Sequence, residues 1–506
     1  MSHPNAPPQP PVAWDAIVIG SGMGGLAFAS LYAQLAKKKV LLLERHYVPG
    51  GFTHSFSRHG FRWDVGLHYV GAMAPASPSR RLMDMVTGGK VQWQALPDAF
   101  DVYHYPGLRL SAFSAPERYA AAVCEQFPTE APAIQRYFAD LAATAKALGP
   151  QVWSWSLPAW ISAPMRFFGR RAAALSTLTV AEYMRQHFED PRLIAALTSH
   201  WGDYGLPPHQ ASFGTHAMIT ASYFGGAFFP VGGAERIAAA ALQVVRQHGG
   251  DCLVNQKVDR ILVENGAAVG VQVGSHLYRA PLVVSNAGAA STLGPLLGQT
   301  APPSLAAASS AITLYLGLRE SPASLGMQGE NHWVHENFSH VPSASIDSVF
   351  LSFSSLNNPK ARKHTAQVMA IVDTSLFRSW QGTSWQKRGP DYQAFKEALS
   401  RRLLSLAEKA APGLTQLVEY QELSTPLSVE HFTGSTSIYG SPGDARRFRE
   451  RNPTVRTEIR NLLLTGADAC CLGIQGSLMG GVFAAAYALH PLLGFPRIMR
   501  ASQNSH

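Results

Sequence analysis

The sequence predicts an α/β protein whose parallel sheet is assembled from segments far apart in the chain. Residues 15–44 run as an apolar strand, a glycine-rich turn, a helix of small residues and a second apolar strand that ends in an acid, which is a βαβ unit. Residues 461–468 form a further apolar strand that ends in Gly and Asp, and a glycine- and alanine-rich helix start follows at 473–486. Because 506 residues exceed one ordinary hydrophobic core, we expect two joined domains.

The first βαβ unit has the residue types of a dinucleotide site. Gly20 permits the tight turn, Gly22 lets the backbone approach a pyrophosphate, and Gly25 lets helix and strand pack closely. The helix N-terminus offers N–H groups and a positive dipole end to phosphates. Glu44 is placed to accept hydrogen bonds from a ribose diol. The candidate cofactor-binding residues of this unit are Gly20, Gly22, Gly24, Gly25, Glu44 and Arg45.

Arg45 leaves the type of dinucleotide open. A 2′-phosphate would suit this side chain, although we prefer to interpret it as a solvated charge at a strand end. The glycine pair Gly50-Gly51, so soon after the ribose acid, indicates backbone laid close against a long ligand. The segment 49–71 resembles the FAD-binding fold of amine oxidases and phytoene desaturases, where it passes beneath the flavin. That resemblance implies FAD as the cofactor.

The C-terminal segment supplies the second half of the expected cofactor site. A strand followed by a helix N-terminus can hold a pyrophosphate and the flavin's pyrimidine end with backbone donors. Our candidates there are Gly466, Asp468, Gly476 and Ser477. The resemblance also implies that the backbone at Val258 contacts the adenine; its side chain alone indicates only a strand. Between these segments, the Asn265-Gly266 pair predicts a hairpin, and residues 281–288 predict a strand that rejoins the main sheet.

Further motifs resemble one branch of this family, which contains retinol saturase and the carotenoid isomerases. They are Gly-Leu-His68-Tyr69-Val-Gly, residues 204–213, residues 226–235 and Thr-Gly-Ala-Asp468. Ala467 departs from the pattern, since a glutamine is common at that position. The resemblance runs from about residue 12 to residue 494 and is thinner across 320–450. It implies an oxidoreductase acting on a long hydrophobic polyene.

The expected architecture is a Rossmann-like FAD-binding domain interleaved with an α+β substrate-binding cap. We assign 12–90, 230–310 and 455–494 to the FAD domain, 91–229 and 311–454 to the cap, and 1–11 to a flexible proline-rich lead. Residues 314–318 and 370–373 are predicted cap strands. Residues 394–411 are a predicted amphipathic helix with Arg401, Arg402 and Lys409 outward.

The expected chemistry follows from a flavin, whose protein supplies binding, orientation and exclusion of water. An aromatic and histidine-rich middle region suits an apolar polyene, and we expect Trp201, Tyr204, His216, Tyr223 and Phe228 to line the cavity. His68 and Tyr69 are the candidate catalytic residues for proton transfer, because their loop follows the expected flavin segment. Three functions compete: a saturase, a desaturase or redox-neutral isomerase of the same fold, and a non-catalytic lipid escort.

The composition limits the classes of binding partner that we expect. The net charge of +9 is dispersed and accompanies no recognition motif, so we expect no nucleic acid partner. Tryptophans and phenylalanines beside arginines in residues 152–171 indicate contact with a membrane surface, or else a lid over the cavity. We therefore expect a cytoplasmic protein that is peripheral on the membrane. We expect no metal site, and the adjacent Cys470 and Cys471 indicate small packing residues rather than a redox pair.

Overall fold

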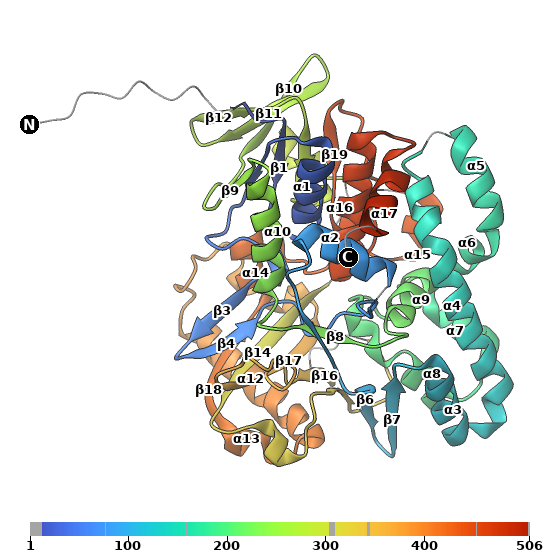
Figure 1. The fold of residues 1–506 in the computed structure, drawn as a ribbon. Coiled ribbons are helices and arrows are strands. Elements are labelled where there is room, and N and C mark those ends of the chain that lie inside the picture. The colour runs from blue at the N-terminus through green and yellow to red at the C-terminus, as the bar shows by residue number, and fades with distance from the viewer. Residues whose placement is uncertain are drawn as a thin grey trace, which may run out of the picture.

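A computed structural model describes residues 13–75, 77–157, 159–302, 309–341, 345–451 and 453–503, so the expected N-terminal lead lies outside the described residues. Its first layer is a five-stranded parallel sheet in the order β19-β13-β1-β2-β9 (Figure 1). The strands are β1 (Ala16–Ile19), β2 (Val40–Leu43), β9 (Asp251–Leu253), β13 (Val283–Ser285) and β19 (Leu462–Leu464). The predicted βαβ unit and the return of residues 283–285 to this sheet are confirmed.

Apolar helices cover this sheet. The helix α1 (Met23–Ala36) contacts both α10 (Glu235–Gln247) and α16 (Gly473–Leu489), and α17 (Gly494–Gln503) packs on α16. The close approach of α1 and α16 requires glycine, because a Cβ on Gly481 would lie 2.5 Å from the Cβ of Ala27. In the described part of the chain no single helix is long and apolar enough to cross a membrane; α16 and α17 pass that test only together, bent by 119°.

A small antiparallel sheet extends from the parallel one. It consists of β10 (Arg260–Glu264), β11 (Ala267–Val273) and β12 (His276–Arg279). The predicted hairpin is confirmed: Asn265 and Gly266 connect β10 and β11 with φ values of 51° and 73°. Two positive φ angles in a row are what a two-residue hairpin turn demands, which explains the Asn-Gly pair.

A seven-stranded sheet forms the second layer, in the order β18-β14-β17-β16-β15-β6-β7. Its strands are β6 (Ala99–Tyr105), β7 (Leu108–Phe113), β14 (Ser310–Leu318), β15 (Asn331–His335), β16 (Ser348–Ser352), β17 (His364–Val372) and β18 (Val418–Ser424). The predicted strands 314–318 and 370–373 correspond to parts of β14 and β17. The parallel pairing of β6 with β15 joins residues near 100 to residues near 330 in one sheet.

The helices formed by residues 116–222 lie to one side of the seven-stranded sheet (Figure 1). They are α3 (Pro116–Gln126), α4 (Ala131–Ser154), α5 (Ala159–Phe168), α6 (Arg170–Ser176), α7 (Val180–His187), α8 (Pro191–Leu197) and α9 (Phe213–Ser222). The aromatic stretch 152–171 is divided between interior and surface. Trp153 is buried against Phe483 and Phe495. Trp160 and Phe167, on α5, are 74% and 62% exposed.

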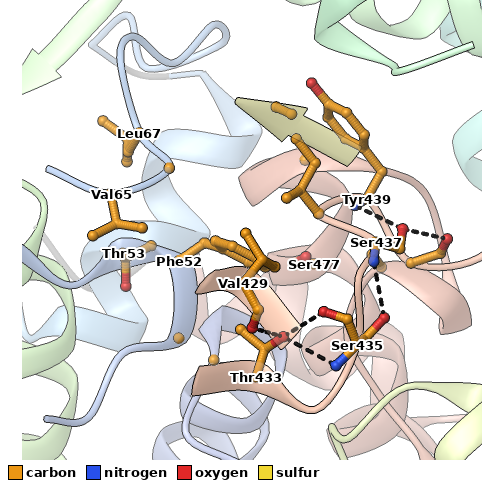
Figure 2. Close-up of a pocket in the computed structure, with 18 of the residues that line it drawn as sticks. Phe52, Thr53, Val65, Leu67, Val429, Thr433, Ser435, Ser437, Tyr439 and Ser477 are labelled. Carbon is orange, nitrogen blue, oxygen red and sulfur yellow. Dashed lines mark hydrogen bonds between the residues drawn. The ribbon is translucent and has the colours of Figure 1, made fainter. Parts of the chain in front are cut away.

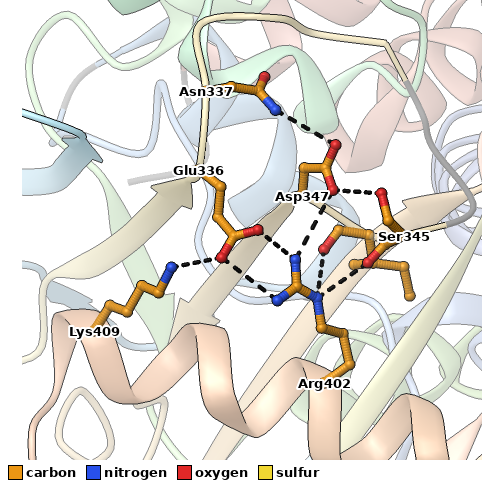
Figure 3. A network of polar contacts seen from close by, with 7 residues as sticks. Glu336, Asn337, Ser345, Asp347, Arg402 and Lys409 are labelled. Carbon is orange, nitrogen blue, oxygen red and sulfur yellow. Dashed lines mark hydrogen bonds and ion pairs between the residues drawn. The ribbon is translucent and has the colours of Figure 1, made fainter.

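Helix α12 (Pro390–Ala410) packs on the second sheet and begins four residues before the predicted start at 394. Arg401 and Lys409 are exposed, as expected, whereas Arg402 is half-buried. Arg402 and Lys409 both bond to Glu336, which follows β15, and Arg402 Nε also donates to the carbonyl oxygens of Ser345 and Ile346 at 3.0 Å (Figure 3). The network ties the helix to the end of the sheet.

Short elements complete the wall around the region between the sheets. They are the hairpin of β3 (Ser55–Arg58) and β4 (Phe61–Asp64), the pair of β5 (Trp93–Ala95) and β8 (Phe228–Pro230), α2 (Pro78–Thr87) and α14 (Pro426–Thr433). The hydrophobic core extends without a break from α1 and α16 to α4 and α9.

Candidate functional site

A cavity of about 1800 Å³ lies between the two large sheets. Its lining includes the residues at the carboxyl ends of β1, β2, β13 and β19, among them Gly20, Glu44, Asn286 and Thr465. Ligands of open α/β sheets bind at this edge. The volume exceeds the range of about 300–1000 Å³ typical of a pocket for one small ligand, so this cavity has room for a dinucleotide and a second molecule.

Two helix N-termini face the cavity from the side of the parallel sheet. Gly22 and Met23 at the start of α1 line it, and so do Gly473, Gly476 and Ser477 at the start of α16. Neither helix has a side-chain cap. The positive ends of two helix dipoles and their N–H groups therefore meet in one place, which suits a pyrophosphate.

The glycines of the first turn divide into two roles. Gly20, with φ of +88°, and Gly22 line the cavity. Gly24, Gly25 and Gly466 do not line it. A Cβ on Gly24 would collide with the backbone of Gly466, and one on Gly25 with the carbonyl oxygen of Gly20. These three glycines let the strand ends and α1 approach one another, so they determine the shape of the site without lining the cavity.

Glu44 is buried at the cavity wall and is held in place by three donors. Its Oε2 accepts from the Ser21 backbone N–H at 2.8 Å and from the Ser21 hydroxyl at 2.6 Å, and its Oε1 accepts from the His46 N–H at 2.8 Å. The Ser21 hydroxyl oxygen in turn accepts from the Gly50 N–H at 3.0 Å. Because a carboxylate has about four acceptor positions and three are occupied here, one remains for a hydroxyl of a ribose.

The other predicted cofactor-binding residues lie at the same end of the cavity, where the parallel strands end. Asp468 lines the cavity, and its two oxygens accept the N–H groups of Ser441 and Ala289, both at 2.6 Å. Arg45 also lines it, and its guanidinium donates to the carbonyl oxygen of His431 at 3.4 Å, which ties the end of β2 to α14. Gly50, Gly51 and Val258 complete this part of the lining.

A serine- and threonine-rich segment closes the cavity opposite the loop 52–67 (Figure 2). The Thr433 hydroxyl lies 2.9 Å from the carbonyl oxygens of Val429 and Ser435, either of which can accept its hydrogen. The backbone N–H groups of Ser435 and Ser437 donate to the hydroxyls of Thr433 and Ser435 in return. These local bonds fix the last turn of α14 and residues 434–437, which follow it without secondary structure, so that side chains of this wall face Phe52 and Leu67.

The loop that carries His68 and Tyr69 reaches the cavity wall, where both side chains are buried. Gly66 packs on Phe52, and the backbone of Val70 pairs with that of Phe228, with N–H to O distances of 2.8 and 2.9 Å. Phe228 does not line the cavity; as part of β8, it holds the loop through its backbone. Within the part of the chain that the structure describes, neither ring nitrogen of His68 has a hydrogen-bond partner, and burial lowers its pKa to about 4, so the imidazole is neutral.

The predicted substrate residues are likewise divided. Trp201 and Tyr223 line the cavity, whereas Tyr204 and His216 are buried and do not. His216 Nε2 lies 2.7 Å from the Tyr137 hydroxyl, and its Nδ1 lies 3.2 Å from that of Tyr204. Helix α9 therefore directs His216 towards α4, while Met218, Ile219 and Ser222 of the same helix line the cavity.

Sequence reasoning missed two carboxyl groups beneath the loop. Asp203 lies on the cavity wall, and the Tyr69 hydroxyl is 2.9 Å from its Oδ2 and 3.1 Å from Oδ2 of the buried Asp101. The Tyr223 hydroxyl donates to Asp203 at 3.2 Å. Burial raises the pKa of Asp203 to about 7 and that of Asp101 well above its usual value.

Comparison with known proteins agrees with this site. Residues 18–87 match the family model described as an NAD(P)-binding Rossmann-like domain. The chain is 31% identical to an all-trans-retinol 13,14-reductase of Danio rerio, over 94% of this chain and 86% of that protein. It is 26% identical to a chloroplastic prolycopene isomerase 1 of an Oncidium hybrid cultivar, over 94% of this chain and 82% of the relative. The cyclohexylamine oxidase of Brevibacterium oxydans has the same fold, with a TM-score of 0.60 over 97% of this chain and 100% of that chain at 18% identity.

These relatives confirm the predicted fold class, a Rossmann-like domain combined with a second, mixed α/β part. They also confirm that the chain is an oxidoreductase acting on C=C bonds rather than a lipid escort. The resemblance that the motifs around His68 and Asp468 indicate is confirmed as well. The chain therefore belongs to the phytoene desaturase-type family, in the branch of the all-trans-retinol 13,14-reductases and prolycopene isomerases.

Proposed function

We propose that this protein binds FAD without a covalent bond and uses it to saturate a C=C bond of a long hydrophobic polyene. One observation carries the proposal: a single cavity joins a dinucleotide end to an apolar end. At the first end, the starts of α1 and α16 suit the pyrophosphate, Glu44 suits the adenosine ribose, and the backbone near Val258 suits the adenine. At the second end, the lining is aromatic and aliphatic, with Tyr223, Met218 and Phe350 among its residues.

The donors at the first end fit a flavin dinucleotide. The start of α16 adds N–H donors beyond those of α1, and the unpartnered ring nitrogens of His68 lie on the same cavity wall. A bound flavin supplies hydride transfer. The chain itself binds and orients the polyene between apolar side chains, excludes water with the 429–437 segment, and supplies a proton from the wall that holds His68, Tyr69 and Asp203.

The experiment follows from this division of roles. Purified protein should be yellow, and heat or acid should release free FAD. The enzyme, reduced anaerobically with dithionite, should be reoxidised by all-trans-retinol, and the product should gain two hydrogens by mass spectrometry. Protein that takes up no FAD, or a reduced enzyme that no polyene reoxidises, would refute the proposal.

A second candidate, isomerisation, has support from the likeness to prolycopene isomerase. The same assay separates the two functions, because an isomerase returns a product of unchanged mass and altered chromatographic retention. A desaturase would return a product that has lost two hydrogens, with oxidised rather than reduced enzyme as the reactant.

We also propose that the protein is peripheral on the cytoplasmic face of a membrane through α5. The exposed Trp160 and Phe167, with Arg170 stacked over the Phe167 ring at 4.8 Å, support this contact. Helix α5 packs on α4, whose Ala145 and Gly149 line the cavity. A lipid-soluble substrate would therefore enter near the membrane surface.

A further inference from the structure

The two carboxyl groups beneath the His68–Tyr69 loop form one hydrogen-bonded cluster. Asp101 is held by the Asn331 amide, which donates to its Oδ1 at 3.2 Å, and by Tyr69 at its Oδ2. Asp203 Oδ2 is approached by the hydroxyls of Tyr69 and Tyr223. The two aspartates come from distant parts of the chain, β6 and the turn before Tyr204, and Tyr69 bridges them.

The number of hydrogens in this cluster decides its charge. The Tyr69 hydroxyl has one hydrogen but lies within hydrogen-bond distance of two carboxyl oxygens, at 2.9 and 3.1 Å. It can donate to only one of them, so the other contact needs a hydrogen from the carboxyl group itself. Among the described residues, no Lys or Arg forms an ion pair with Asp101 or Asp203. Two buried carboxylates without a cation would repel each other, so at least one of the pair holds its proton.

Two arrangements of the hydrogens satisfy the same geometry. In one, the Asp101 carboxyl donates to the Tyr69 oxygen and Tyr69 donates to Asp203. In the other, both bonds are reversed, so that Asp203 carries the acid proton. Exchange between them moves a proton along the line Asp101–Tyr69–Asp203 without moving a heavy atom. The cluster therefore connects the buried Asp101 carboxyl group, which can hold a proton, to Asp203 on the cavity wall.

Other groups on the wall are poorer acids near neutral pH. His68 is neutral, because burial lowers its pKa to about 4, and its remaining N–H is a very weak acid. Burial raises the pKa of the Tyr69 hydroxyl and of the Cys470 and Cys471 thiols above their usual values. The carboxyl group of Asp203 is the one whose pKa, about 7, matches a general acid at physiological pH.

We propose that Asp203 is the catalytic residue that protonates the polyene, and that Tyr69 is a positioning residue that links it to Asp101. This inference rests on the proposed saturase function. The π bond breaks, one carbon takes a hydride with its electron pair from the reduced flavin, and the other takes the Asp203 proton as its O–H bond breaks. The hydroxyls of Tyr69 and Tyr223 stabilise the resulting carboxylate. Exchange along Asp101–Tyr69–Asp203 places the shared acid proton on Asp203 before the transfer, and water returns one proton to the cluster after it. A hydride donor would supply the two electrons for the next turnover.

The test compares Asp203→Asn, Tyr69→Phe and the control Asp140→Asn. Asp140 is a matched control because it is buried and accepts from the Tyr183 hydroxyl at 3.0 Å, but it pairs with Arg171 and does not line the cavity. Each holoenzyme is first checked for FAD content. The enzyme is then reduced with dithionite and mixed with all-trans-retinol in a stopped-flow instrument. Infrared spectra recorded from pH 5 to pH 9 follow the C=O band of protonated carboxyl groups.

We expect Asp203→Asn to keep FAD and to slow flavin reoxidation by about a hundredfold or more, the usual loss when a general acid is removed. The component of the parent's protonated-carboxyl band that titrates near pH 7 should shift in D₂O and be absent from this variant. The components of Asp101 and Asp64, whose pKa values burial also raises, should remain. Tyr69→Phe removes one of the two hydroxyls at Asp203 and keeps Tyr223, so it should slow reoxidation less than Asp203→Asn and move the titration of the band. Asp140→Asn should reproduce the parent's reoxidation rate and band.

The outcomes separate the inference from the function it rests on. A parent that binds no FAD, or that retinol and carotenes do not reoxidise, refutes the proposed function. A parent that reacts, with Asp203→Asn reacting at the same rate, refutes only the role of Asp203. Should Asp203→Asn fail to retain FAD, the infrared titration of the parent and of Tyr69→Phe decides whether Asp203 holds a proton near neutral pH. The absence of a protonated carboxyl between pH 5 and pH 7 overturns the inference whatever the activity.

Discussion

The ionisation of Asp203 should be visible in the stability of the folded protein. An aspartate in an unfolded chain titrates near pH 4, whereas burial raises the pKa of Asp203 to about 7. Between these values the folded state holds a proton that the unfolded state has lost, so stability falls as pH rises, by about 1.4 kcal/mol per pH unit. The penalty is absent below pH 4 and complete above pH 7, where it reaches at most about 4 kcal/mol. Partial solvation from the cavity reduces it.

Asp203→Asn removes this titration, so its stability relative to the parent should rise between pH 4 and pH 7. An unfolding entropy of about 2.1 cal/mol/K per residue gives about 1 kcal/mol/K for 506 residues. The difference in melting midpoint between variant and parent should therefore grow by up to about 4 °C across this range. Differential scanning fluorimetry at one scan rate, with and without added FAD, measures it.

A control variant and a comparison of pH profiles test whether Asp203 is protonated in the folded state. The control Asp140→Asn removes a carboxylate that is paired with Arg171, so it should lower the midpoint at pH 7. If the profiles of Asp203→Asn and the parent stay parallel from pH 4 to pH 7, Asp203 does not hold an extra proton in the folded state and the argument from burial fails.

Three further predictions concern the cofactor and the membrane. Glu44→Ala leaves three donors without their acceptor, so FAD should bind about tenfold or more weakly, measured by flavin fluorescence on dilution. Gly22→Val should yield colourless protein, since even a Cβ there would lie 2.6 Å from the side-chain amide nitrogen of Asn286. A yellow variant would contradict the inference that this turn has no room for a side chain beside the cofactor. Replacing Trp160 and Phe167 with serine should reduce sedimentation with anionic liposomes while FAD stays bound, whereas the equally exposed Leu277→Ser should not; equal binding by both variants would remove α5 as the contact.

The cofactor end of the cavity could be predicted from the sequence because its signals are local. The turn that contains Gly20, the acid Glu44 and the hairpin at Asn265 each need only a few neighbouring residues to be recognised. The strand near 463 also has a short-range signature, an apolar run that ends in Gly and Asp. Each of these patterns reflects a single local requirement of the backbone or the ligand, so the structure agrees closely with the prediction made from it.

The other end could not be predicted, because its contacts are long-range. Asp101 lies in β6 and Asp203 ends a short helical turn, and no spacing in the sequence indicates that Tyr69 brings them together. Composition did indicate an aromatic region around residues 200–229, but it did not indicate which faces of its elements are turned to the cavity. His216 is directed away from it, and Phe228 contributes its backbone, because the packing of α9 against α4 and of β8 against the loop decides orientation.

The order of strands in the parallel sheet has a consequence for biosynthesis. Strand β1 is made first, but its neighbour β13 is made only after residue 283, and β19 completes the sheet only at Leu464. A chain emerging from the ribosome can pair β1 with β2 at once, but the other edge of β1 stays unpaired until β13 is made, and the cavity lining is incomplete until α16 is made. Such pairing across a long sequence separation makes folding slow and exposes intermediates to aggregation. Chaperone supply and flavin supply at the end of synthesis, rather than early in it, should then govern the yield of active protein.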